Sequence, residues 1–336
     1  MNITLHTTLD EFDALQDRWD DLVRQSFANT PFSLFAWQRA WWAAYQPGDL
    51  WIVTVKADGN LVGILPGFIE TNDGRHTLRL IGHIDVVDYM DVIVRQGDET
   101  TVLSELADFL AEQRDHFDAI GLANIQEHSP TYEMFPDKLS AAGFETVDTE
   151  QNEVSPIIEL PDNYDSYLND ILSSRERKET KRKMRKAEAG LYDVSWYKVG
   201  KDHDLDAELE QFLGLMASAD AEKAAFLDND QHVDFFKRVM PAMHEQGYLE
   251  LLTVSIDGEP CAAYLNFDYN DKIYVYNSGL DPDKYGALSP GIVLIQFAIQ
   301  HAIERGRKAF DLLRGDETYK YKMGATDTRI FQINAR

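Results

Sequence analysis

The pattern of hydrophobic and polar positions occurs twice along this chain of 336 residues. Residues 36–59 align without a gap with residues 235–258, at an offset of 199 residues. In each copy a helical pattern ends near a glycine, an apolar strand runs through Thr-Val, and an Asp-Gly pair follows. Asp-Gly supplies the positive φ angles of a tight hairpin turn, so we expect a return strand after it.

Each copy continues with the same kinds of elements. A further strand is predicted at residues 76–84 in the first copy and 272–280 in the second. Apolar residues at helical spacing then predict a helix over residues 100–113 and another over residues 291–306. A strand opening with Phe-Asp closes each copy, and strands joined through a helix are usually parallel. The pattern therefore predicts helix, antiparallel meander, helix and strand, twice over.

This element order predicts a mixed α/β fold with two tandem domains. Each domain is expected to be a mixed, mostly antiparallel sheet flanked by helices. The stretch at residues 150–165 is polar and rich in turn residues, so it separates the copies. We expect an N-terminal domain over residues 1–155 and a C-terminal domain over residues 156–336. A hydrophobic content of 44% is enough to form two cores of ordinary size.

The two copies differ between the last meander strand and the helix. In the second copy this loop contains Gly286 and Gly291, and Ser289 stands just before an apolar helix. Glycines let backbone N–H groups turn toward a ligand, and a helix N-terminus carries partial positive charge. The loop is therefore a candidate cradle for a pyrophosphate, to which Lys284 adds a positive charge. An ordinary serine-capped helix start is the alternative interpretation.

The first copy has a different sequence at the corresponding place. Residues 85–100 are acidic, carry an additional apolar stretch and lack the paired glycines. We do not expect this copy to hold a polyphosphate. The first copy is therefore predicted to be degenerate, and any acyl-donor or phosphate site is expected in the second copy.

Charge is distributed unevenly along the chain. It has 58 acidic and 32 basic residues, a net charge of −26, and this field argues against general nucleic-acid binding. Residues 175–186 nevertheless contain eight basic and only two acidic side chains. On a helical projection seven of these cations fall on one side, among them Arg175, Lys178 and Arg182. Crowding of like charges favours a facing anion, with intramolecular pairing and plain solvation as alternatives.

Several classes of site and location are not expected. The single cysteine, Cys261, excludes an intrachain disulfide and a multi-thiolate metal site, and it fits a reducing cytoplasm. The nine histidines form no zinc-binding pattern, so no metal is expected. The start of the chain does not resemble a signal peptide, and no apolar stretch reaches the roughly 18 residues that a membrane span requires.

Three stretches resemble the GNAT acyltransferase superfamily, and more closely its tandem CelD-like and FemABX-like branch. They are residues 30–42, residues 173–188, and residues 285–324, which contain the run FD-x-x-x-G-D-E-x-Y-K. The resemblance implies two GNAT-like domains and an acyl-CoA, such as acetyl-CoA, as donor. The Fem-like relatives imply aminoacyl-tRNA as another donor. The usual GNAT phosphate loop is absent in its common form, and Lys284-Tyr285-Gly286-Ala287 only approximates it.

A charged cluster follows the last predicted strand of the second copy. Acyl transfer to an amine, whose free pKa is about 10.4, requires a proton acceptor and a proton donor for the leaving thiolate. Asp316 is the first candidate for the base or acceptor-binding carboxylate, and Glu317 is the second. Tyr319 is the candidate proton donor. Lys320 or Arg314 is expected to bind an anionic group of a substrate, and the alternative is a charged loop without catalytic function.

The predicted function is transfer of an acyl group from acyl-CoA to an amine. The resemblance suggests a small-molecule acceptor, an amino sugar or another small amine, in an envelope-polysaccharide pathway. A Fem-like transfer from aminoacyl-tRNA to a peptidoglycan precursor is one alternative. The other is a catalytically silent module whose basic helix docks on an anionic polymer or membrane surface.

Overall fold

The computed structural model describes residues 1–82, 86–283 and 285–336. The chain divides into two compact units, which are described separately. Unit 1 comprises Met1–Val154 together with Thr328–Arg336, and unit 2 comprises Ser155–Asp327. The last strand of the chain is therefore part of unit 1, although it follows all of unit 2 in the sequence.

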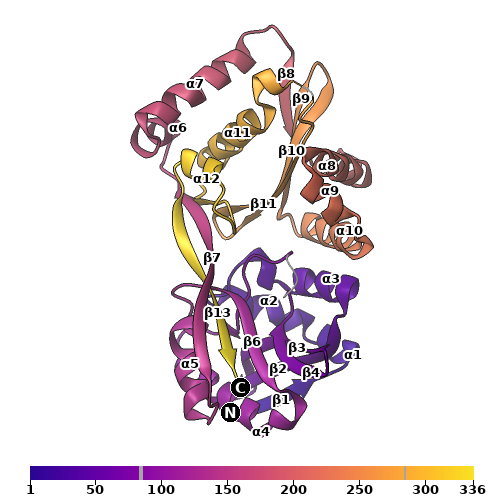
Figure 1. Ribbon diagram of the computed structural model, residues 1–336, viewed down its shortest axis with the longest axis vertical. Helices are drawn as coiled ribbons and strands as arrows, with labels where there is room; N and C mark the ends of the chain where they lie inside the picture. Colours follow the sequence, from indigo (N-terminus) through magenta and orange to yellow (C-terminus); the bar gives the residue numbers. More distant parts are fainter. Residues whose placement is uncertain (83–85, 284) are drawn as a thin grey trace. The chain divides into compact units, whose positions relative to one another are not determined.

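Unit 1 contains a mixed sheet with the strand order β1, β2, β3, β4, β6, β13, β7 (Figure 1). Strands β4 and β6 are parallel, and the short β5 pairs with β3. The strands span Asn2–His6 (β1), Gly48–Ala57 (β2), Asn60–Asn72 (β3), Arg75–Leu80 (β4), Ile93–Val94 (β5), Ala119–Gln126 (β6), Val147–Glu159 (β7) and Thr326–Ala335 (β13). The helices span Leu9–Asp13 (α1), Gln16–Arg24 (α2), Phe35–Tyr45 (α3), Glu99–Glu112 (α4) and Pro130–Ala141 (α5), with 3₁₀ turns η1 at Pro31–Ser33 and η2 at Arg114–His116.

Aromatic side chains fix helices to opposite faces of the unit 1 sheet. Phe68 on β3 and Trp51 on β2 point to opposite faces, because Trp51 pairs with Gly67, the neighbour of Phe68. The ring of Trp41 on α3 lies 5.6 Å from that of Phe68, and the ring of Phe109 on α4 lies 5.9 Å from that of Trp51. Burial of these large rings therefore holds α3 on one face and α4 on the other.

The strands of unit 2 pair in the order β7, β12, β11, β10, β9, β8. Strands β11 and β12 are parallel, and the other neighbouring strands in this order are antiparallel. The strands that unit 2 adds span Val194–Lys198 (β8), Leu249–Ile256 (β9), Glu259–Tyr269 (β10), Lys272–Leu280 (β11) and Ala309–Asp311 (β12). The helices span Tyr164–Ser166 (α6), Ser174–Glu188 (α7), Leu205–Ala219 (α8), Ala221–Leu227 (α9), Asp230–Glu245 (α10), Pro290–Glu304 (α11) and Thr318–Lys322 (α12), with a π-helical turn η3 at Tyr167–Ile171 and a 3₁₀ turn η4 at Gly286–Leu288.

Both units contain the hairpin that the repeated Asp-Gly pair predicts. In unit 1, Asp58 and Gly59 have φ angles of 49° and 82° and join β2 to β3. In unit 2, Asp257 and Gly258 have φ angles of 52° and 81° and join β9 to β10. These left-handed angles match the twist of the flanking strands, so the prediction of a tight hairpin is confirmed in both copies.

Helices lie on both sides of the unit 2 sheet (Figure 1), with α7 and α11 on one side and α8 to α10 on the other. At Gly279 on β11 an added Cβ would lie 2.5 Å from the backbone nitrogen of Met216 and 2.6 Å from the carbonyl carbon of Leu215. Glycine is therefore required there, because it lets α8 approach the strand closely. The pairing of β10 with β11 also slips by one residue, so Tyr276 bulges from β11.

Candidate acyl-transfer site

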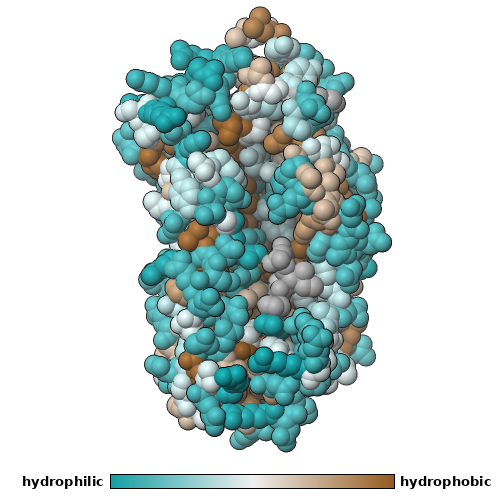
Figure 2. All heavy atoms as spheres, viewed as in Figure 1, coloured by the Kyte–Doolittle hydropathy of each residue, from teal (hydrophilic) through white to brown (hydrophobic). Residues whose placement is uncertain are grey.

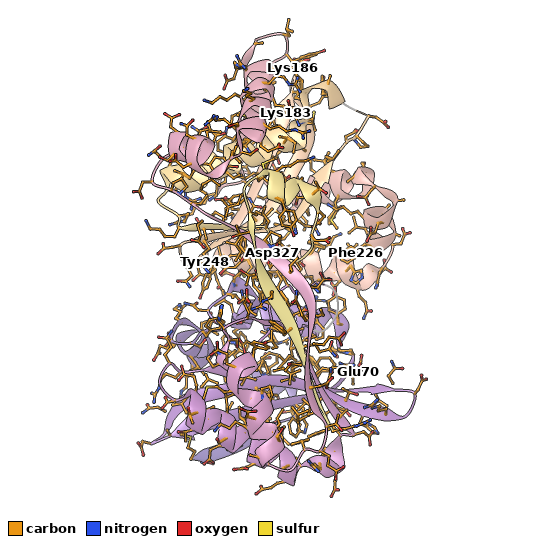
Figure 3. The ribbon with its side chains drawn as sticks, turned by 60° about the vertical axis from the view of Figure 1, so that its left-hand side comes forward. Glu70, Lys183, Lys186, Phe226, Tyr248 and Asp327 are labelled. Atoms are coloured by element: carbon orange, nitrogen blue, oxygen red, sulfur yellow. The ribbon has the colours of Figure 1, made fainter. Side chains whose placement is uncertain are left out.

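The cationic segment forms α7, a helix whose first turn is capped by Ser173. The hydroxyl of Ser173 accepts a hydrogen bond from the backbone N–H of Glu176 at 3.2 Å. Near the other end, the ammonium of Lys186 donates to the carbonyl oxygen of Ala287 at 2.8 Å, which joins α7 to η4. Lys183 and Lys186 both project from this helix in Figure 3, and the surface over α7 is hydrophilic in Figure 2. The basic helix thus lies beside the loop that precedes α11.

A cavity of about 710 Å³ lies between α7, α11 and α12. Three of the cations expected to bind an anion line it: Arg175, Lys178 and Arg182. The structure adds Lys183 and Lys322, which the sequence had not singled out. The acidic residues in its lining are Glu176 and Glu179, and the apolar ones are Ile292 and Met323. Five cations against two carboxylates give this cavity a positive charge in an acidic protein.

Glu179 organises part of this cationic lining. Its carboxylate accepts hydrogen bonds from Nε and Nη2 of Arg182 at 2.9 and 2.7 Å. The ammonium of Lys183 lies 3.9 Å from the same carboxylate. The hydrogen bonds from Arg182 lower the pKa of Glu179, so it stays ionised and orients the guanidinium. Arg175 is 91% exposed and its Nε lies 4.0 Å from Glu176.

A second cavity, of about 480 Å³, lies at the loop before α11. Gly286, Ser289 and Gly291 line it, as expected for the predicted cradle. An added Cβ at Gly286 would meet no heavy atom within 4 Å, so the bare backbone faces open space. Ser289 has a φ of 54° and its side chain makes no capping hydrogen bond to α11. The serine-cap alternative therefore does not describe this helix start.

The remaining loop residues differ in position. Tyr285 has a φ of 52° and its ring lies 5.6 Å from that of Tyr192, outside the cavity lining. Lys284 lies outside the described residues. Pro290 is the first residue of α11 and has no N–H, so Gly291 and Ile292 offer the first backbone donors of the helix.

Tyr319 and Ile292 line both cavities. Tyr319 belongs to α12 and packs against the unit 2 core. Burial raises the pKa of Tyr319 well above its usual range, with smaller contributions from Tyr264 and the Glu317 carboxylate. Its phenol is therefore protonated at neutral pH. Tyr319 thus brings a protonated phenol to the lining that the two cavities share.

Lys320 holds the loop that precedes α12. Its side chain is 2% exposed, and its ammonium donates to the carbonyl oxygens of Leu313, Arg314 and Gly315 at 3.0, 2.6 and 3.2 Å. It also lies 2.9 Å from a carboxylate oxygen of Glu317. These contacts use the donors of the ammonium, so the structure gives Lys320 a loop-organising position in place of the expected substrate contact.

The two candidate carboxylates lie in different surroundings. The carboxylate of Glu317 contributes to raising the pKa of Tyr319 and counteracts the lowering of the pKa of Lys223, so it lies near both groups. Asp316 is exposed, and its charge contributes to raising the pKa of Tyr321 on the outer side of α12. Neither carboxylate lines these cavities, but that of Glu317 is the one that acts on the pKa of Tyr319, which lines both. Arg314 is half-buried and does not line either cavity.

Comparisons with known proteins bear on the fold of the chain. Residues 174–321, from the start of α7 into α12, match the sequence model of the acetyltransferase (GNAT) domain. The structure of FemX superposes with a TM-score of 0.68 at 15% identity and covers 99% of this chain and 97% of its own. A tandem GNAT protein from the clavulanic acid biosynthesis pathway gives 0.50 at 10% identity, covering 99% and 98%. The chain has a tandem GNAT fold.

Other comparisons add to this fold assignment. L-PGS from Bacillus licheniformis has a TM-score of 0.55 at 11% identity and covers 97% of this chain and 91% of its own. No curated protein matches the chain in sequence. The GNAT-domain match begins with α7, so the cationic helix is part of the domain that the family model describes.

Lys223 of the GNAT domain was not identified from the sequence. It lies on α9, whose N-terminus is capped by Asp220, and its ammonium donates to the carbonyl oxygen and the hydroxyl of Ser278. Ser278 lines the second cavity. The contact depends on the close approach of α8 to β11 at Gly279, which no pattern in the sequence reveals.

The corresponding segment of unit 1 is packed. Val86, Val87, Tyr89 and Met90 are buried, and the backbone N–H of Met90 donates to the carbonyl of Asn124 at 3.0 Å. Apolar side chains therefore fill the described part of this segment of unit 1. Among residues 1–82, 86–283 and 285–336, no helix is long and apolar enough to span a membrane, and no cluster of three or more His, Cys, Asp or Glu residues could hold a metal.

Proposed function

We propose that this protein is an N-acyltransferase that transfers an acyl group directly from acyl-CoA to an amine within unit 2. The observation that carries this proposal is the meeting of two cavities at Tyr319, one strongly cationic and the other mostly apolar. Two substrates that enter from separate cavities can react where these meet, and the buried phenol supplies the proton that the reaction needs.

The cationic cavity suits the phosphate-bearing part of the donor. Its five cations offer charge-assisted hydrogen bonds to phosphate oxygens, and Arg182 is already oriented by Glu179. The loop containing Gly286 and Gly291 lines the second cavity and adjoins the cationic one through Ile292, which lines both. The acyl group would then reach Ile292 and Tyr319.

The reaction in this arrangement needs two proton transfers. The amine attacks the thioester carbonyl, a C–N bond forms, and the C–S bond breaks. Glu317, with Asp316 as the second candidate, accepts the proton that the attacking nitrogen loses. Tyr319 donates its phenolic proton to the leaving thiolate, and water reprotonates the phenol. Burial raises the pKa of the Tyr319 phenol, so this group still carries its proton at neutral pH when the thiolate leaves.

The second cavity suits the acceptor. Its lining combines apolar residues with the hydroxyls of Tyr264, Ser278 and Ser289 and the carboxylate of Asp281. Hydroxyl groups of an amino sugar would find hydrogen-bond partners here, and the carboxylate would attract an amine. We therefore propose an amino sugar or another small polar amine as acceptor, in keeping with a role in envelope-polysaccharide synthesis.

Transfer from aminoacyl-tRNA is the second candidate function. The likeness to FemX and the exposure of much of α7 support it. In that case the nucleic acid would contact α7 beyond the cavity, whereas acyl-CoA would contact the cavity lining alone.

Calorimetric titration with acetyl-CoA tests the proposal. Lys178→Gln and Arg182→Gln, which alter the cavity lining, are expected to weaken binding about tenfold each. Lys181→Gln and Arg185→Gln are matched controls, because these cations stand on the same helix but do not line the cavity. Equal effects in all four variants, or no binding of acetyl-CoA at millimolar concentration, would refute donor binding here. Binding of aminoacyl-tRNA instead would favour the second candidate.

A further inference from the structure

A different cationic cavity lies in unit 1, away from every residue assigned to acyl transfer. It has a volume of about 300 Å³ and is lined by residues of β4, β6, β13 and β7 and their ends. Unit 1 contains 27 acidic and only 11 basic residues, and three of those basic residues line this cavity: Arg75, Arg79 and Arg336. Asp148 is the acidic residue among its described lining residues.

The strand pattern brings the arginines of β4 to one face. Arg75, Thr77 and Arg79 alternate with the buried Leu78 and Leu80, so the three polar side chains share the face opposite to the core. Two arginines and a threonine therefore stand in a row along the cavity wall.

Arg79 is held in position over the sheet. Its Nε donates to a carboxylate oxygen of Glu70 on β3 at 3.2 Å, and Figure 3 labels this glutamate. On β6, an added Cβ at Gly121 would lie only 2.4 Å from Nη1 of Arg79. The bare backbone of Gly121 thus leaves the space that the guanidinium occupies, and the donors of Arg79 are oriented before any ligand binds.

Neutral hydrogen-bonding groups complete the cavity. Nε2 of Gln332 donates to Oδ1 of Asn334 at 2.7 Å, which leaves the amide nitrogen of Asn334 available as a donor. Nε of Arg336 donates to the hydroxyl of Thr146 at 3.3 Å. This bond does not use the two terminal nitrogens of Arg336, which lines the cavity. These amides and hydroxyls are the partners that sugar hydroxyls require.

We propose that this cavity binds the phosphate of a small polyhydroxylated molecule, a ligand of the sugar-phosphate class. Three guanidinium groups face the carboxylates of Asp148 and of Glu70, which pairs with Arg79, so a net charge of about +1 remains to attract a phosphomonoester of about −2. Arginine forks bind phosphate oxygens in pairs, and the amides and hydroxyls match the sugar. The volume is at the lower end of small-molecule sites, which fits a ligand of this size.

Calorimetric titration of the full chain tests this site with three probes: inorganic phosphate, glucose 6-phosphate and glucose. Glucose 6-phosphate is expected to bind more tightly than phosphate, and glucose is not expected to bind measurably. Arg75→Gln and Arg79→Gln should each weaken binding of glucose 6-phosphate about tenfold. Arg24→Gln is the matched control, because this arginine of unit 1 pairs with Asp21 outside the cavity. Raising the salt concentration should weaken binding.

Gly121→Ala provides a second test that removes no charge. The new Cβ should displace the guanidinium of Arg79 and weaken binding, while the thermal unfolding transition shows whether unit 1 stays folded. Equal affinities of the Arg75, Arg79 and Arg24 variants would overturn the site. Failure of both phosphate probes to bind at millimolar concentration would also overturn it. Equal affinity for phosphate and glucose 6-phosphate would overturn the assignment to a polyhydroxylated ligand.

Discussion

The ammonium nitrogen of Lys223 lies 2.5 Å from the carbonyl oxygen of Ser278 and 3.1 Å from its hydroxyl oxygen. Because that hydroxyl accepts a hydrogen bond from the ammonium, its own O–H is free to donate into the second cavity. Burial lowers the pKa of Lys223, and the carboxylates of Asp220, Glu317 and Glu222 counteract this effect. For the proposed transfer, we infer that Lys223 is a positioning residue that acts through Ser278.

Ser278→Ala and Lys223→Met should both reduce kcat, and the double variant should be no slower than the slower single variant. Residues that act as a unit give non-additive effects, so a double-mutant cycle measures this coupling. Acetyl-CoA affinity, measured by calorimetry, should change little. Multiplicative losses in the double variant would show that the two residues act separately.

The lowered pKa of Lys223 predicts an alkaline limit to the rate. As pH rises through that pKa, the ammonium loses a proton and no longer polarises Ser278, so kcat should fall. Lys223→Arg keeps the charge and should move this limit to higher pH. A pH profile of kcat that is the same for the arginine variant and the natural protein would contradict the assignment.

Tyr319→Phe removes the phenolic proton and leaves the ring. We expect kcat to fall about 100-fold or more, because general acid catalysis contributes on that scale. The dissociation constant for acetyl-CoA should change much less, since the ring still lines both cavities. Tyr321→Phe, on the exposed side of the same helix, is the matched control. A Tyr319→Phe variant with full activity would exclude the proposed proton transfer.

Lys320→Met should destabilise unit 2 by about 2–3 kcal/mol, because three loop carbonyls lose a charged donor. Activity should also fall, since this loop carries Glu317. Lys322→Met, an exposed change on the same helix, should alter the free energy of unfolding by less than about 0.5 kcal/mol. Denaturant unfolding measures both. Similar stabilities of the two variants would show that Lys320 does not organise the loop.

Asp91 predicts a pH-dependent stability for unit 1. Burial raises the pKa of Asp91 from 3.8 to about 6, although the hydroxyl of Ser129 donates to its carboxylate at 2.6 Å. The folded state therefore binds this proton more tightly than the unfolded state, and its contribution to stability is present at pH 4 and lost as pH rises to 6.

Asp91→Asn should remove this dependence. At each pH, the free energy of unfolding of the natural protein is subtracted from that of the variant. This difference should be larger at pH 7 than at pH 4 by on the order of 3 kcal/mol. Denaturant unfolding at both pH values measures the difference. A constant difference between the two proteins across this range would contradict burial of an ionisable carboxyl at this position.

The repeat made much of each unit predictable. Local chemistry determines the turns, since Asp257 and Gly258 adopt the positive φ angles in which these residue types are favoured. Helical spacing predicted the apolar helix at residues 291–306, which the structure shows as α11, at Pro290–Glu304. The cationic helix also follows directly from residues 175–186, which lie within α7.

The candidate site was only partly predictable, because its geometry depends on contacts between distant segments. Nothing in the local sequence distinguishes Lys320, which is buried under loop carbonyls, from the exposed Lys322 two positions later. Lys223 and Ser278 are 55 residues apart and meet only because α8 lies against Gly279. Long-range packing therefore decides which of the charged residues face a cavity.

Because the last strand of the chain belongs to unit 1, the two units are not translated one after the other and cannot be separated by a single cut in the sequence. Strand β13 pairs with β6 through residues such as Ile330 and Ile333, yet it is translated after all of unit 2. A ribosome must therefore release the whole of Ser155–Asp327 before unit 1 receives its last strand. A fragment that ends at Val154 lacks that strand and leaves an edge of β6 unpaired, so residues 328–336 are needed to complete the sheet of unit 1.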